Sequence, residues 1–100
     1  MFRLHKTQAL RKMDIMKVVP TVMRFDGLRI VVYPNDHRPA HVHVIGRGAD
    51  AVFDLNCPDG PVELRENYGF PGRMLRHVLD VLRARLTDLC SAWEHIHGIA

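Results

Sequence analysis

The strongest constraint on the fold is an alternation of apolar and polar side chains on both sides of the dipeptide Asp26-Gly27. Residues Thr21–Phe25 and Leu28–Tyr33 both follow the two-residue period of a β-strand, and Asp-Gly is a preferred sequence for the two-residue turn of a hairpin. The segment therefore predicts an antiparallel hairpin. Because one face of this hairpin is apolar, other parts of the chain must cover that face.

Further strands are expected after the hairpin. Residues His41–Ile45 and Asp50–Leu55 alternate in the same way, and the turn sequence Gly46-Arg47-Gly48 separates them. Val62–Arg65 is short and suits a fifth strand at an edge. We therefore predict a small antiparallel sheet of four or five strands.

The last third of the chain predicts one long helix from after Pro71 to about His97. Its apolar side chains recur at alternating spacings of four and three residues, at Leu75, Leu79, Leu82, Leu86, Leu89, Trp93 and Ile96. Such a seam either covers a sheet or joins two copies of the chain as a coiled-coil homodimer. We favour the covering role because the sheet has a face to bury. The predicted fold class is thus α+β, with the long C-terminal helix on one face of the sheet.

Residues 1–17 differ in charge from the rest of the chain. They hold five basic residues and one acidic residue, whereas residues 18–100 hold nine basic and ten acidic residues. The formal net charge of +3 therefore belongs to a basic N-terminal extension, whose apolar residues have helical spacing. Residues 18–100 then form a single α+β domain that is nearly neutral. Any RNA bound by this domain would have to be held by a few local arginines.

The sequence also indicates where the protein resides. No apolar run approaches the roughly 20 residues of a membrane-spanning helix, and the N-terminus develops no apolar secretory core. We therefore expect a cytoplasmic protein with no membrane partner. In that compartment the two cysteines, Cys57 and Cys90, are expected to be reduced thiols.

Three histidines lie close together in the stretch Asp36-His37-Arg38-Pro39-Ala40-His41-Val42-His43. On a strand, His41 and His43 point to one face while Val42 points to the other, toward the core. Two imidazoles at this spacing can share a divalent transition metal ion such as Zn²⁺, with His37 or Asp36 as a third ligand. Asp54 becomes a fourth candidate ligand if its strand is adjacent.

The same histidines have two other interpretations. Because histidine titrates near neutral pH, His41 and His43 can act as general base and general acid, for example in cleaving RNA through its 2′-hydroxyl group. Arg24 and Arg29 would then hold the phosphate, which makes these four residues the candidate catalytic set. The alternation predicts one polar sheet face that carries Arg24, Arg29, Tyr33, His41, His43 and Asp54. The third interpretation is a solvated sheet face with no chemical role.

From Pro20 onward the sequence resembles a family of short bacterial proteins known as domain of unknown function 4160. The resemblance rests on the stretches Pro20–Ile30 and Asp36–Val44, on Tyr33, and on the C-terminal helix that follows a short acidic strand. It covers about four-fifths of the chain. Ala40 stands where the family usually has a second proline, and the first 17 residues precede the usual start of the family.

This resemblance implies a toxin-like component of a gene pair of the kind proposed to be toxin–antitoxin modules. The implied partner is a small protein encoded nearby, of the type called domain of unknown function 2442. The resemblance assigns no catalytic residues. An enzyme that acts on RNA, a metal-binding protein and a non-catalytic interaction module, homodimeric or not, therefore stay open as alternatives.

Overall fold

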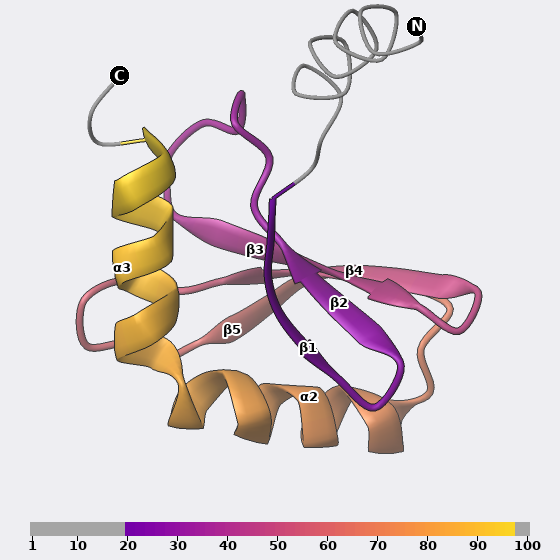
Figure 1. The fold of residues 1–100 in the computed structure, drawn as a ribbon. Coiled ribbons are helices and arrows are strands. Elements are labelled where there is room, and N and C mark those ends of the chain that lie inside the picture. Colours follow the sequence, from indigo (N-terminus) through magenta and orange to yellow (C-terminus); the bar gives the residue numbers. More distant parts are fainter. Residues whose placement is uncertain (1–19, 98–100) are drawn as a thin grey trace, which may run out of the picture.

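A computed structural model describes residues 20–97 of the chain. It contains a five-stranded antiparallel sheet with the strand order β1-β2-β3-β4-β5, followed by two helices (Figure 1). The elements are β1 (Thr21–Phe25), β2 (Leu28–Val31), β3 (His41–Gly46), β4 (Ala49–Asp54), β5 (Glu63–Tyr68), α2 (Gly72–Ala84) and α3 (Leu86–His97). The predicted α+β class, with a five-stranded sheet and C-terminal helical cover, is confirmed. The predicted N-terminal helix of residues 1–17 lies outside the described residues.

Two tight turns set the registers of the first and third strand pairs. At the β1–β2 turn, Asp26 and Gly27 have φ angles of 51° and 77°, and Phe25 pairs with Leu28. Arg47 and Gly48 repeat this at the β3–β4 turn, with φ angles of 54° and 76°. Two successive positive φ angles are typical of the turn whose twist matches that of the flanking strands. The hairpin predicted around Asp26-Gly27 is therefore confirmed.

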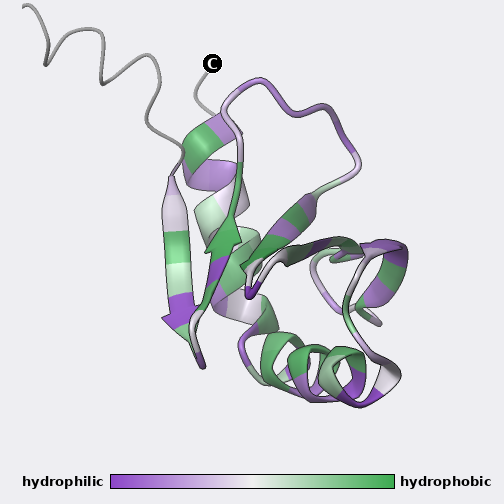
Figure 2. Cartoon of the chain, turned by 90° about the vertical axis from the view of Figure 1, so that its right-hand side faces the viewer, coloured by the Kyte–Doolittle hydropathy of each residue, from purple (hydrophilic) through white to green (hydrophobic). Residues whose placement is uncertain are grey.

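One face of the sheet packs against the helices and forms the core. Alternate residues of β2, β3 and β4 reach this face, where they meet Val78 and Leu82 of α2 and Leu89 and Trp93 of α3. The strand residues of the core are Leu28, Ile30, Val42, Val44, Ala51 and Phe53, all buried. In Figure 2 the strands and helices carry alternating hydrophobic and hydrophilic segments, as expected for elements with one covered and one exposed side.

The long helix predicted for the last third is divided into two. α2 ends at Ala84 and α3 begins at Leu86, and Arg85 between them has φ −115° and ψ 19°. A straight helix of this length would extend about 39 Å, at 1.5 Å per residue, and would run past the small sheet. The break at Arg85 turns α3 sharply away from α2, so that Leu89 and Trp93 remain in the same core (Figure 1).

A disulfide bond between Cys57 and Cys90 joins the turn after β4 to α3. The prediction of two reduced thiols was therefore wrong. It followed from the expected compartment, whereas the fold brings the two Cα atoms to 5.9 Å from each other, within the range that a disulfide spans.

Among residues 20–97, neither helix is long and apolar enough to cross a lipid bilayer.

Candidate metal centre

The face of the sheet opposite α2, called the open face here, carries the polar side chains that the alternation predicted, and α3 reaches this face at one end, where Trp93 meets His41. The register places His43 between Val31 on β2 and Val52 on β4. Two residues further along β3, Ile45 lies between Arg29 and Asp50, and Arg29 in turn faces Arg24 on β1. At the other end of β3, His41 faces Asp54. The sheet therefore brings the predicted face together from four neighbouring strands.

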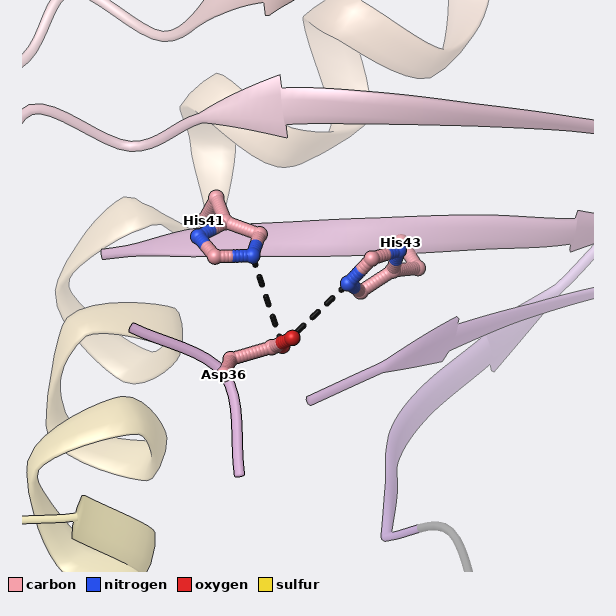
Figure 3. A group of neighbouring side chains, drawn as sticks. All are labelled: Asp36, His41 and His43. Atoms are coloured by element: carbon pink, nitrogen blue, oxygen red, sulfur yellow. Dashed lines mark hydrogen bonds and ion pairs between the residues drawn. The ribbon is translucent and has the colours of Figure 1, made fainter. Parts of the chain in front are cut away.

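Asp36 lies between His41 and His43, in the loop that joins β2 to β3 (Figure 3). Its Oδ2 atom is 3.4 Å from Nε2 of His41 and 3.2 Å from Nε2 of His43. The three residues each offer one potential ligand atom, and these atoms all lie within 4.8 Å of one another. This group, called the Asp36 cluster below, is thus compact enough to surround a single ion.

A short turn holds Asp36 in this place. The backbone N–H of Asp36 donates to the carbonyl of Tyr33 at 3.0 Å. In return, the backbone N–H of Tyr33 donates to Oδ2 of Asp36 at 3.1 Å. An aspartate that hydrogen-bonds nearby backbone in this manner is a common turn former. Hydrogen bonds between residues three apart in the sequence therefore hold the Asp36 carboxylate in its position.

The protonation pattern of His41 follows from its second ring nitrogen. Nδ1 lies 2.8 Å from the carbonyl oxygen of Pro39, and a carbonyl oxygen can only accept, so Nδ1 must carry a proton. In the neutral imidazole, Nε2 then has a lone pair, and that lone pair faces the Asp36 carboxylate. Two electron-rich atoms repel each other unless a proton or a metal ion lies between them.

Aromatic side chains enclose the Asp36 cluster on two sides. The His41 ring centroid is 5.3 Å from that of Trp93 in α3, and the His43 centroid is 4.5 Å from that of Tyr33. The side chain of His41 is 7% exposed and that of Asp36 is 15% exposed, while His43 is 21% exposed. Solvent therefore reaches the cluster mainly beside His43.

Trp93 connects the cluster to the end of α3. Its ring stacks on His97 with a centroid separation of 3.9 Å. Nε1 of Trp93 and Nε2 of His97 are both buried, and neither has a hydrogen-bond partner among residues 20–97. The sequence placed Trp93 in the helical seam, but it carried no signal that this ring would lie against His41.

The structure separates the predicted ligands into two groups. Asp36, His41 and His43 come together, whereas His37 is exposed and lies outside the cluster. Asp54 faces His41 in the register, but its Oδ1 accepts hydrogen bonds from Arg65 at 2.6 and 3.0 Å. Within the described part of the chain, the third ligand position therefore falls to Asp36.

Tyr68, at the far edge of the open face, has a shifted acidity. Its hydroxyl donates a hydrogen bond to Glu66 at 3.2 Å. This hydrogen bond and the negative charge of Glu66 raise the pKa of Tyr68, because a phenolate beside a carboxylate is disfavoured. The β5 side of the open face is thus acidic in character.

The two ring nitrogens of His41 both face protein oxygens, and this bears on the metal-binding and proton-transfer interpretations of the Asp36 cluster. A general acid or base needs a ring nitrogen that reaches the reacting group, and both nitrogens of His41 are directed at protein oxygens. A metal-ligating histidine, in contrast, commonly donates its other N–H to a backbone carbonyl, as His41 does to Pro39. His43 has no such second partner among the described residues.

Fold and site together define a small α+β protein with a meander sheet and a histidine–aspartate cluster on its open face. The chain belongs to the family described as domain of unknown function (DUF4160), whose model matches residues 27–94. This match spans the cluster and most of both helices. Comparisons with curated proteins and with solved structures find no match.

Proposed function

We propose that this protein binds a divalent transition metal ion, such as Zn²⁺, through Asp36, His41 and His43. The observation that carries the proposal is the orientation of His41. Its Nδ1–H is used by the Pro39 carbonyl, so that in the neutral imidazole the lone pair at Nε2 faces the Asp36 carboxylate. A cation between these atoms converts a repulsive contact into two favourable ones.

Two of the three ligand separations in the cluster suit such an ion. With Zn–N and Zn–O bonds of about 2.0–2.1 Å at tetrahedral angles, two ligand atoms lie about 3.3 Å apart. The two carboxylate–imidazole separations are 3.2 and 3.4 Å. The Asp36 carboxylate and each imidazole are therefore already at the separation that tetrahedral binding needs.

The number of ligands indicates the kind of site. Structural zinc sites use four protein ligands, whereas catalytic sites use three and leave a position for water or substrate. Two histidines and one carboxylate also form a ligand set found in iron enzymes with open positions. We propose an open site of this three-ligand kind, which a small molecule could enter beside His43.

Metal binding can be tested on the full chain purified without a histidine tag. Elemental analysis and calorimetric titration with Zn²⁺ should give one ion per chain for the wild type. Asp36→Asn and His43→Gln should remove this binding while the fold is retained. His37→Ala is the matched control, because His37 belongs to the same loop but lies outside the cluster.

Trp93 provides an independent readout of the same site. It is the single tryptophan of the chain, and its ring lies against His41. A paramagnetic ion such as Co²⁺ should quench its fluorescence in the wild type and in His37→Ala, but not in Asp36→Asn. Equal quenching in all three proteins, or no binding in the wild type, would exclude the proposed site.

The toxin-like role implied by the family resemblance stays a separate prediction. Induced expression in a bacterium, with and without the neighbouring gene, should slow growth only in the absence of the small protein partner. Unchanged growth in both cases would exclude that role and would leave the metal proposal untouched.

A further inference from the structure

Two arginines face each other on the open face without an acidic partner among residues 20–97. Arg24 on β1 and Arg29 on β2 are paired in the register, with Arg24 exposed and Arg29 half-buried. Within residues 20–97, neither guanidinium forms an ion pair or a side-chain hydrogen bond, although Arg38, Arg65 and Arg85 all do. Like charges directly opposite each other on a sheet are destabilising, so this pair costs stability in the absence of an anion.

The arginine pair lies beside the Asp36 cluster on the same face. Arg29 faces Ile45, which is two residues from His43 on β3. Arg29 and His43 are thus diagonal neighbours, a relation in which the backbones lie about 7–8 Å apart and long side chains can meet. Arg24 is one strand further from the cluster. A ligand of moderate size could therefore contact both the arginines and an ion at the cluster.

We propose that Arg24 and Arg29 bind the phosphate group of a phosphate ester. The ester oxygen and the organic group attached to it, called the ester side, are directed toward the Asp36 cluster. Two guanidinium groups offer paired N–H donors that fit the oxygens of a tetrahedral phosphate. A metal ion with adjacent arginines is a recurrent arrangement for holding phosphate groups. The position of the ester side depends on the proposed metal site, whereas the arginine contact with the phosphate does not.

The charges on the rest of the open face limit where the phosphate group can bind. Asp50 and Glu66 lie on β4 and β5, beyond Ile45 and Val52. Their carboxylates repel a phosphate on that side, and Arg65 is already engaged by Asp54. The open face is thus basic over β1 and β2 and acidic over β4 and β5, which confines the phosphate group to the Arg24–Arg29 side.

The test uses the full chain and three probes: inorganic phosphate, phenyl phosphate and a short single-stranded RNA. Phosphorus NMR titrations at low salt should show binding of all three to the wild type. In the double variant Arg24→Gln/Arg29→Gln, the affinity for each probe should fall by about tenfold or more, since charge-assisted hydrogen bonds are lost. Arg83→Gln is the control, because Arg83 is exposed on α2 and forms no ion pair within the described chain.

Several outcomes separate this inference from the proposed metal site. Equal binding to the wild type and the double variant, or no binding to the wild type, would overturn the phosphate proposal even if Zn²⁺ binds. If the wild type does not bind Zn²⁺ but still binds the phosphate probes, and the double variant does not bind them, the result supports the arginine site and refutes the metal site. Binding of the RNA far tighter than phenyl phosphate supports a nucleic-acid ester, while similar affinities support a small ester.

Discussion

The two faces of the sheet are built from the same strands, but they differ in burial and in the polarity of their side chains. On the helix-covered face, residues such as Val42, Val44 and Phe53 are almost fully buried, and their burial stabilises the fold. On the open face, His43 and Asp54 retain partial exposure and polar partners. Within the part of the chain that the structure describes, the arginine pair on that face has no acidic partner. The comparison teaches that the covered face determines whether the chain folds, whereas the open face carries the polar groups for which we propose binding.

The largest expected effect is on the covered face. Phe53→Ala removes a side chain that is 1% exposed, and it should lower the free energy of unfolding by about 3–5 kcal/mol. Asp50→Ala, on the open face of the same strand, should change it by less than about 0.5 kcal/mol. Urea denaturation of both variants checks this difference. Similar losses from the two substitutions would show that the faces are not distinct in their contribution to stability.

The disulfide bond should have the next largest effect, because it holds α3 and Trp93 against the rest of the core. Cys57 and Cys90 are 33 residues apart in the sequence, and closing a loop of that length stabilises a fold by about 3–4 kcal/mol in the chain-entropy model. Cys57→Ser/Cys90→Ser should lose that amount in denaturation experiments under oxidising conditions. Under reducing conditions the wild type should match the variant, and a persistent difference there would contradict this explanation.

A smaller effect is expected at the Asp36 cluster, and only in the presence of metal. At a Zn²⁺ concentration of about one hundred times Kd, binding should stabilise the wild type by about 2.7 kcal/mol. Asp36→Asn should lose this gain, because the neutral amide is a poor metal ligand. Its thermal unfolding without metal should stay close to that of the wild type, since the amide oxygen can still accept from the Tyr33 N–H. If Zn²⁺ raises the melting temperature of both proteins equally, the ion binds elsewhere.

The smallest effect has the opposite sign. Arg24→Gln relieves the repulsion between two guanidinium groups that face each other, and it should stabilise the fold by about 0.2–1 kcal/mol. The gain should shrink in high salt, because salt screens exposed charges. Denaturation at low and high ionic strength measures both. A loss of stability at low salt would mean that Arg24 supports the fold and is not held in place for a ligand.

The sequence predicted the features that depend on neighbouring residues. Strand alternation is a local property, so the first four strands, the turn at Asp26-Gly27 and the shared face of His41 and His43 could all be predicted. The fifth strand was predicted at Val62–Arg65 but runs from Glu63 to Tyr68, and its end was missed because its residues are all exposed and show no buried period. The break at Arg85 could not, because it depends on the length of a sheet that the helix sequence does not describe. The choice of Asp36 over His37 depends on the turn with Tyr33, and the Cys57–Cys90 bond depends on the path of α3.

The Asp36 cluster has a consequence for folding that follows from its place in the chain. All three potential ligands come from a stretch of eight residues, between Asp36 and His43. Joining the ends of so short a loop costs little chain entropy, and contacts between near neighbours in sequence form early and quickly. The cluster can therefore assemble as soon as β3 begins to pair, before α3 has packed. A metal ion bound at that moment would act as a nucleus for the sheet as well as a ligand of the finished protein.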